Sequence, residues 1–332
     1  MANYPQIDDC QGVWKLKEVN NAIMGGYWRL GGARGIFAGG KTPTALNVID
    51  FITIASAGNA TDFGDLLVAT HQQACLSSHT RGIVGTGNAP SLTNTNIGYI
   101  TMASAGDAAD FGDVTVGRAS MSGASNSTRG VFLGGLTPTR LNVIDYITIN
   151  SLGNAVDFGN LTHAIGSASG IASPTRALNG GGNVPVTNVI ASIEIATTGN
   201  ATDFGDLVQA RNDLGCAGSS TRGVFIGGDD GGDPSPANVT RLDFVTIASQ
   251  GNSVSYGDLS VAVKYGAASS NSIRGIYGGG DPKTNVIEFF EITAGGNAVD
   301  FGDLTVARTN IQNGILSQAH GGLNDGYQGA RT

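Results

Sequence analysis

An internal repeat is the feature of this sequence that most constrains its fold. A string that reads DFGDL, or a close variant, occurs six times at intervals of 48, 47, 46, 52 and 45 residues. An arginine, followed by glycine in five copies, keeps step with it. The aromatic residues of the string and the arginines are Phe63, Phe111, Phe158, Phe204, Tyr256 and Phe301, and Arg34, Arg81, Arg129, Arg176, Arg222 and Arg274. Six copies of one unit predict a single repeat domain.

Each unit holds four segments with the character of short β-strands, such as QQACLSS, RGVFLGG, NVIDYITI and DFGDLTV. Their β-branched and aromatic residues favour strands, and 52 glycines among 332 residues disfavour helices. A four-stranded antiparallel unit must cover its faces with neighbouring copies. The sequence therefore predicts an all-β fold, a six-bladed β-propeller.

The first copy begins at its second strand, between Gly31 and Gly40. We expect the missing innermost strand to come from the other end of the chain, from Asn310 to Ser317, so that strand exchange closes the ring. Residues 31–318 then form the propeller, residues 1–30 a lead-in with a short helix, and residues 319–332 a tail. Seven of the nine prolines fall in the loop between the second and third strands, which agrees with this assignment because proline is excluded from inner strands.

Two resemblances accompany the repeat. The Gly-Gly after the second strand, the period and the aromatic residue of the fourth strand resemble kelch-type propellers. The strings TRGVFxGG, NVIDYITI and GNATDFGDLTVAR, which follow the lead-in GVWKLKEVNNAIMGGYW, resemble repeat proteins of marine bacteriophages, especially cyanophages. Those proteins are assigned to tail fibres or other structural parts of the virion. The resemblance implies a protein of the virion, in the tail, made in the host cytoplasm.

Composition excludes several classes of partner. The net charge of −8 repels nucleic acid backbones. No apolar run reaches the ~18 residues that a membrane helix needs, and the acidic N-terminus is unlike a secretory signal. We therefore expect neither nucleic acid binding nor membrane insertion. Cys75 and Cys216 take positions that hold small residues in other copies, so we interpret them as packed structural thiols.

Catalytic chemistry finds little support in the sequence. The four histidines, His71, His79, His163 and His320, share no metal-ligand spacing, and we interpret them as scattered surface or loop residues. No G-x-S-x-G motif occurs. We predict a protein that is not an enzyme and has no metal or cofactor, and a kelch-type enzyme is the weakest alternative.

Paired aspartates flank the aromatic residue of the repeat. We predict one structural contact per blade between these carboxylates and the repeat arginine, because both lie on the same face of the ring. The aspartates are Asp62, Asp65, Asp110, Asp113, Asp203, Asp206, Asp300 and Asp303. A calcium site in each blade is the alternative.

The opposite face differs from copy to copy. It carries the loops between the second and third strands and those that join the fourth strand to the next blade, and a constant scaffold with variable loops is typical of a binding surface. Drift in unconstrained loops is the alternative. The candidate binding residues are Lys41, Thr42, Asn88, Arg140, Asp229, Asp230, Asp233, Lys283, His71, Arg118, Arg211, Asn212, Lys264 and Tyr265.

The lead-in carries an apolar stripe at helical spacing, formed by Trp14, Leu16, Val19 and Ile23. It either packs on the propeller or anchors the protein to other virion proteins, in homo-oligomeric form. We predict a tail-fibre or tail-tip module whose variable loops contact a glycan or protein of the host surface. The leading alternative is an internal structural or decoration protein of the capsid or tail.

Overall fold

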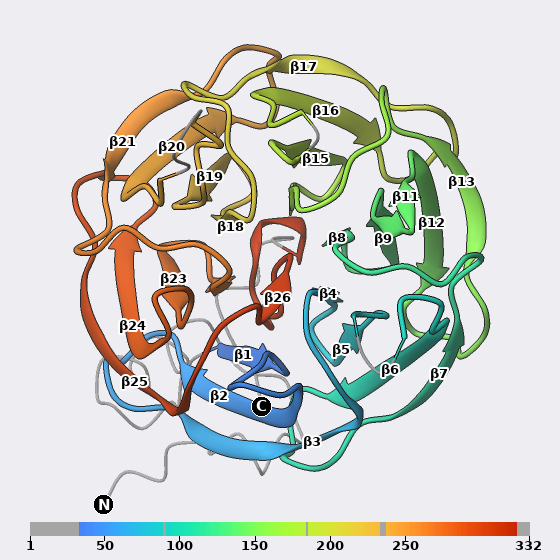
Figure 1. Ribbon diagram of the computed structural model, residues 1–332, viewed down its shortest axis with the longest axis horizontal. Helices are drawn as coiled ribbons and strands as arrows, with labels where there is room; N and C mark the ends of the chain where they lie inside the picture. The colour runs from blue at the N-terminus through green and yellow to red at the C-terminus, as the bar shows by residue number, and fades with distance from the viewer. Residues whose placement is uncertain (1–32, 89–90, 184, 233–236, 324–332) are drawn as a thin grey trace, which may run out of the picture.

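The computed structural model describes residues 33–88, 91–183, 185–232 and 237–323. Within them the chain forms six antiparallel sheets in a ring around a central axis (Figure 1). The predicted six-bladed β-propeller is confirmed. The predicted N-terminal helix, the anchoring candidates between Trp14 and Ile23, and Asp233 lie outside the described residues. No helix in the described part of the chain is long and apolar enough to cross a membrane.

The repeated segments become the strands of the six blades. In each blade the strands follow chain order from the axis outward (Figure 1). Blade 1 holds β1 (Arg34–Ala38), β2 (Leu46–Thr53) and β3 (Thr61–Thr70), and blade 2 holds β4 (Gln73–Ser77), β5 (Arg81–Val84), β6 (Asn96–Thr101) and β7 (Ala109–Asp113). Blade 3 holds β8 (Ser122–Ser125), β9 (Arg129–Leu133), β12 (Val143–Thr148) and β13 (Val156–Asn160), and blade 4 holds β14 (Ser169–Ala172), β15 (Arg176–Gly180), β16 (Val189–Glu194) and β17 (Thr202–Asp206). Blade 5 holds β18 (Gly215–Gly218), β19 (Arg222–Ile226), β20 (Arg241–Thr246) and β21 (Val254–Asp258), and blade 6 holds β22 (Ala267–Ser270), β23 (Arg274–Gly278), β24 (Thr284–Glu291) and β25 (Val299–Arg308). A small hairpin of β10 (Leu136–Thr137) and β11 (Thr139–Arg140) decorates blade 3.

The core lies between the blades. Six clusters of buried apolar side chains each combine residues of two adjacent blades. The cluster that joins blades 6 and 1 contains Phe37 and Ile276, and each of these side chains is fully buried. Burial of one such side chain contributes about 1.5–3 kcal/mol. Cys75 and Cys216 lie in these clusters as free thiols, as predicted, and burial raises the pKa of Cys216 to about 12.

The end of the chain completes blade 1. The Ile36 N–H donates to the Leu316 carbonyl at 2.9 Å, and Ser317 pairs with Gly35 in antiparallel orientation. The Ser77 hydroxyl donates to the Ser317 carbonyl at 2.7 Å, which ties the new strand to blade 2. The predicted closure by strand exchange is confirmed.

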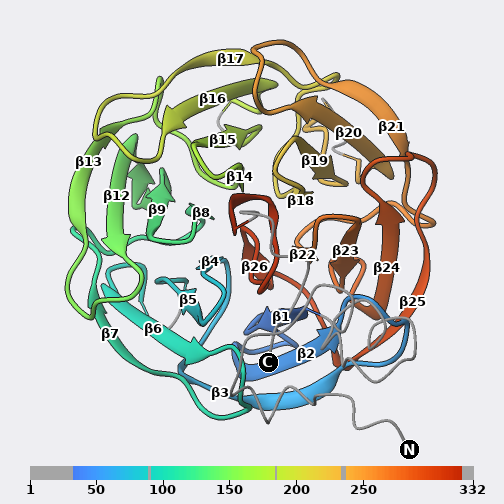
Figure 2. The ribbon, with the colours of Figure 1, turned by 180° about the vertical axis from the view of Figure 1, so that it is seen from behind.

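The closing segment also fills the channel along the axis (Figure 2). Before it reaches blade 1, β26 (Gln312–Asn313) pairs in parallel with β4, and beyond it the 3-10 turn η2 (Gly321–Leu323) is buried. His320 is 2% exposed, and its Nε2 lies 3.1 Å from the Ser77 carbonyl oxygen. The prediction of a surface or loop histidine is therefore wrong for His320, because the residues that follow Ser317 continue inside the ring. Burial lowers its pKa to about 4.

The DFGD string joins neighbouring blades at the outer strands. The Asp65 N–H donates to Asp107 Oδ1 of blade 2 at 3.0 Å, and the Gly106 N–H donates to the Phe63 carbonyl at 2.7 Å. The same contacts recur around the ring, and Asp303 with Asn59 links blade 6 to blade 1. A side chain on the glycine of the string would meet the carbonyl of the neighbouring blade, so the close approach of the two backbones requires glycine there.

The predicted contact between the repeat arginines and these carboxylates is wrong. Each guanidinium lies over an aromatic ring of its own blade, such as that of Arg129 at 4.3 Å from the Tyr146 centroid. It also donates to a carbonyl of the next blade, as Arg129 does to Ile195 at 2.9 Å. Among the described residues, the ion pairs of repeat arginines go to Glu194 and Glu291 of the third strands.

The reason for the difference is the local geometry of the outer strand. Phe63 is buried and the adjacent Asp62 is exposed, as strand alternation requires. A shift in register between β2 and β3 interrupts the alternation at this point, and Asp65 is exposed as well. The buried aromatic residue packs edge-to-face on an aromatic residue of the third strand, as Phe63 does on Phe51 with centroids 5.9 Å apart. The arginine covers that pair, so it stacks on rings and bridges blades.

Candidate functional site

The variable loops lie together on one face, as the sequence predicts. In five blades the loop that enters the blade forms a β-bridge with the loop between its second and third strands. The bridges are Lys41 with Thr309, Ala119 with Leu136, Gly166 with Asn183, Asn212 with Asp229 and Lys264 with Asp281. We call this side of the ring the variable face, and the side of the DFGD contacts the constant face.

Six residues of the entering loops encircle the axis on the variable face. They are Gln72, Ser120, Ser167, Asp213, Tyr265 and Asn310, and we call them the mouth ring. Each has a φ between 53° and 60°, the left-handed region that costs a residue with a side chain roughly 1–2 kcal/mol.

Backbone hydrogen bonds hold the mouth ring in this conformation. The Ser167 N–H donates to the Ser120 carbonyl and the Asp213 N–H to the Ser167 carbonyl, both at 2.9 Å, and similar bonds complete the circle. Asn88 and Asn183, from the loops between the second and third strands, donate to the side chains of Gln72 and Ser167. Strained residues that the surroundings fix in this way concentrate at functional sites.

The mouth ring is most unusual where blades 4, 5 and 6 meet. Asp213 is 7% exposed and accepts hydrogen bonds from Ser167 and Tyr265. Burial raises the pKa of its carboxyl to about 6, because the charged form loses its hydration there, and the two hydrogen bonds and Lys264 offset only part of that effect. Burial raises the pKa of Tyr265 as well. This side of the mouth therefore holds a carboxyl group that titrates near neutrality.

The acidic loop of blade 5 lies beside this carboxyl group. Lys264 Nζ lies 2.5 Å from Asp229 Oδ2 and 5.4 Å from the centroid of the Tyr265 ring. Asp230 accepts hydrogen bonds from the N–H groups of Gly232 and Ala237, which lower the pKa of its carboxyl. Asp230 thus shapes its own loop, while Asp229, Lys264 and Tyr265 form a charged edge around Asp213.

Two candidate binding residues lie elsewhere. Arg118 and Arg211 are fully buried and form ion pairs with Asp145 and Asp243, at 2.9 and 2.6 Å. Their assignment to the binding surface is wrong, because the side chain turns into the blade instead of out of the loop. The sequence holds a signal for this pairing: an arginine eight residues after the first aspartate of DFGD, at Arg118, Arg211 and Arg308, accompanies an aspartate in the third strand of the next blade, in NVID or in the equivalent RLD of blade 5.

The remaining described candidates lie on the variable face. Arg140 Nε donates to Asn183 Oδ1 across blades 3 and 4, and Lys283 Nζ donates to Thr42 Oγ1 across blades 6 and 1. Among these candidates Lys283 is exposed, and Asn212 and Asp229 are largely buried. The others are half-buried: Lys41, Thr42, His71, Asn88, Arg140, Asp230, Lys264 and Tyr265. Burial and the nearby Lys41 lower the pKa of His71.

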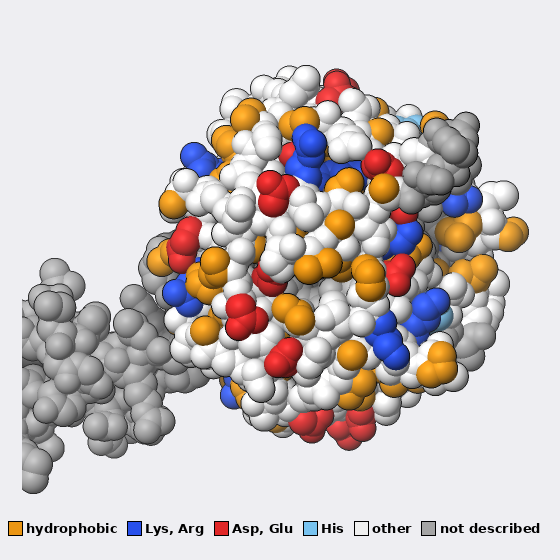
Figure 3. Space-filling view, turned by 60° about the vertical axis from the view of Figure 1, so that its left-hand side comes forward, with side chains coloured by type: hydrophobic (Ala, Val, Ile, Leu, Met, Phe, Trp, Pro, Cys, Tyr) orange, Lys and Arg blue, Asp and Glu red, His pale blue; other side chains and the backbone are white. Residues whose placement is uncertain are grey.

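Charged residues make up only 13% of the sequence. Figure 3 brings forward the side of blades 5 and 6 and shows acidic and basic side chains lying singly among polar and apolar ones. Among the described residues, no group of three or more histidine, cysteine, aspartate and glutamate side chains is placed to hold a metal ion. The most distinctive polar arrangement is therefore the mouth ring with its charged edge.

Together the described residues define the class of fold: a six-bladed β-propeller of antiparallel sheets. A solved structure titled "Structure of YjhT" is similar to it, with a TM-score of 0.62 and 11% sequence identity over 75% of this chain and 88% of that chain. At this identity the likeness shows the fold alone. No protein-family model matches the sequence, and no curated protein matches it either.

Proposed function

We propose that this propeller is a non-enzymatic binding module of a bacteriophage virion, located in a tail fibre or at the tail tip. Its variable face contacts the surface of the host cell. The resemblance of the repeats to those of marine bacteriophage proteins supports the virion, and the contrast between the two faces supports binding.

That contrast is the observation that carries the proposal. On the constant face the same contacts recur in blade after blade, from Asp65 with Asp107 to Asp303 with Asn59. On the variable face equivalent positions carry unlike side chains, and one side of the mouth concentrates Asp213, Lys264 and Tyr265. A ring that needed both faces only for stability would repeat both.

The ligand that suits this face is polar. Hydroxyl, amide, carboxylate and ammonium groups surround the mouth, and such groups recognise partners by hydrogen bonds. A host glycan, or a polar protein surface, has the complementary chemistry. The lead-in would then connect the propeller to other virion proteins, and several copies would act together in one particle.

Antibody labelling of intact virions tests the proposal. One antibody recognises the sequence DDGGDPSPA, residues 229–237, of which Asp229 and Asp230 lie on the variable face, and the matched control recognises residues 249–253 on the constant face of the same blade. We expect the first antibody to label the tail and to block adsorption to host cells, while the second does not block adsorption. Particles in which residues 229–237 are inaccessible would indicate the alternative, an internal structural or decoration protein. Particles that neither antibody detects, before or after disruption, would contradict a role in the virion.

A further inference from the structure

The buried arginine–aspartate pairs define an internal position that every blade possesses. An arginine at the end of one blade reaches the middle of the third strand in the next, as Arg308 reaches Asp50 in blade 1 at 3.0 Å. Arg118 and Arg211 do the same in blades 3 and 5. We call the space that the arginine side chain fills the pair slot. Its residues are equivalent in all blades, because each pairs with the outer strand in the same register.

The other three blades lack the arginine. Blade 2 has Thr70 with Gly98, and blade 4 has Ile165 with Ala191, so both members of the pair are replaced together. In blade 6 the arginine is replaced by Val263 but the carboxylate remains, as Glu288. Blade 6 therefore keeps the acidic half of the pair alone.

A cavity of about 290 Å³ occupies the slot of blade 6. Val263 and Tyr277 line its apolar wall, and Lys283 lines it as well, from the loop between β23 and β24. Glu288 is 6% exposed, and its Oε1 accepts a hydrogen bond from the Ser260 N–H at 3.1 Å. Lys283 Nζ is bonded to Thr42 at 3.0 Å, and no ion pair among the described residues involves Glu288.

The filled slots show what such a cavity accommodates. Arg118 Nε donates to the Gly134 carbonyl at 2.6 Å, and Arg211 Nη1 donates to the Gly227 carbonyl at 2.9 Å. The equivalent residue in blade 6, Gly279, lines the cavity together with Glu288. The slot thus retains a carboxylate and a carbonyl-bearing turn that elsewhere receive a guanidinium group.

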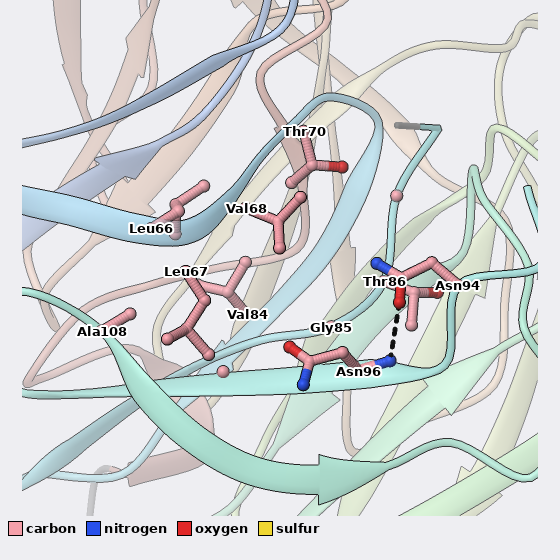
Figure 4. A pocket seen from close by; sticks show the side chains of 12 residues that line it. Leu66, Leu67, Val68, Thr70, Val84, Gly85, Thr86, Asn94, Asn96 and Ala108 are labelled. Carbon is pink, nitrogen blue, oxygen red and sulfur yellow. Dashed lines mark hydrogen bonds between the residues drawn. The ribbon is translucent and has the colours of Figure 1, made fainter. Parts of the chain in front are cut away.

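Blade 2 provides the contrast. Its slot leaves a cavity of only about 30 Å³, lined by Thr70, Val84 and Asn96 among others (Figure 4). Its lining residues include neither an aspartate nor a glutamate. A slot that lacks both partners therefore offers no site for a cation, and the site in blade 6 depends on the carboxylate that remains there.

From these observations we propose that the pair slot of blade 6 binds a guanidinium group on an aliphatic stem, with Glu288 as the counter-ion. The ligand is an arginine-like small molecule or an arginine side chain of a protein that docks on the variable face, where the loop of Pro282 and Lys283 borders the cavity. In the filled slots the guanidinium group donates both to the carboxylate and to a backbone carbonyl, as Arg118 does to Asp145 and Gly134, and this planar set of donors distinguishes it from an ammonium group. This proposal does not depend on the virion role.

Calorimetric titration with N-ethylguanidinium tests the proposal, with Glu288→Gln as the first variant. We expect saturable binding to the wild-type protein and an affinity at least tenfold lower for Glu288→Gln, since a charged partner is lost. Glu194→Gln, which alters an exposed carboxylate on the constant face, is the matched control and should bind as wild type. Equal binding to wild type and Glu288→Gln, or no saturable binding to the wild type, would overturn the proposal.

A second variant rebuilds the intramolecular pair. In Val263→Arg/Glu288→Asp the slot carries the same residues as blade 5, so the protein should melt at a higher temperature and no longer bind N-ethylguanidinium. Retained binding by this folded double variant would also overturn the proposal. Titration with the peptide acetyl-Gly-Arg-Gly-amide separates the two sources: binding comparable to N-ethylguanidinium indicates a protein arginine, and binding of the small probe alone indicates a small molecule.

Discussion

Among the described residues, three guanidinium groups are fully buried inside the ring, and each is held by a single carboxylate and by backbone carbonyls. A buried pair of this kind adds little net stability, because both charges lose their hydration. Removal of one partner is costly, because the other is left buried and uncompensated. Blades 2 and 4 agree with this expectation, since they lack both partners, whereas blade 6 keeps Glu288 without an arginine.

The ion pair in blade 5 can be compared with the two apolar residues, Ile165 and Ala191, that take the same positions in blade 4. Arg211→Ile leaves Asp243 buried without its cation, so we expect the free energy of unfolding to fall by about 3–5 kcal/mol. The double variant Arg211→Ile/Asp243→Ala, which reproduces Ile165 and Ala191, should recover most of that loss. Denaturant unfolding measures both. Losses that simply add in the double variant would show that the two residues act independently.

Asp213 is the second residue whose burial makes a prediction. Its pKa is raised from 3.8 to about 6, so the folded protein holds the proton more tightly than the unfolded chain. The stability that this proton provides is complete below pH 3.8 and is lost as the pH rises through 6. Asp213→Asn removes the charge. The free energy of unfolding of the variant, relative to that of the wild type, should therefore rise between pH 4 and 7, by up to about 3 kcal/mol. Thermal unfolding at several pH values measures the gain, and a difference that does not change with pH would contradict a buried, titrating Asp213.

At the scale of the elements, the segment that follows β25 has two tasks. Ser317 and its neighbours complete blade 1, and β26 and η2 fill the axis of the ring. Both tasks depend on close backbone contact with the innermost strands. A side chain at Gly322 would meet the Ser125 carbonyl, whereas a side chain at Gly199 on the constant face would meet nothing within 4 Å.

Substitutions at these two glycines test whether the segment packs against the innermost strands. We expect Gly322→Ala to lower the free energy of unfolding by about 1–3 kcal/mol, because an added methyl group must displace the backbone in a packed channel. Gly199→Ala should change it by no more than about 0.5 kcal/mol. Both values come from denaturant unfolding. If the two variants were equally stable, the segment would not be seated against the innermost strands.

At the scale of the whole molecule, the repeat alone was enough to predict the blade, the number of blades and the closure by the end of the chain. These features follow from strand patterns and from the strand that the first copy lacks. The side-chain contacts were harder to predict. The predicted pairing of the repeat arginines with the DFGD carboxylates rests on their lying on one face, but strand alternation at Asp62 and the register shift that follows it expose both Asp62 and Asp65, while Phe63 between them is buried. Likewise, a loop position did not reveal that Arg118 and Arg211 turn inward.

The mouth ring could not be predicted from residue types, because polar residues such as Gln72, Ser120 and Tyr265 occur in loops throughout the sequence. What distinguishes them is a left-handed backbone fixed by hydrogen bonds around the axis. Only the closed ring creates this geometry. The division into a constant and a variable face, in contrast, was evident from comparison of the six copies, and it carries the proposed function.

Binding to intact host cells tests that division most directly. The variant Lys41→Ala/Arg140→Ala/Lys283→Ala changes the variable face, and Asp62→Ala/Asp110→Ala/Asp203→Ala changes exposed residues of the DFGD strings. With fluorescently labelled propeller, we predict roughly tenfold or greater loss of affinity for the first variant, which corresponds to 1.4 kcal/mol or more, and wild-type binding for the second. Unchanged binding by the first variant, or a loss confined to the second, would contradict a binding role for the variable face.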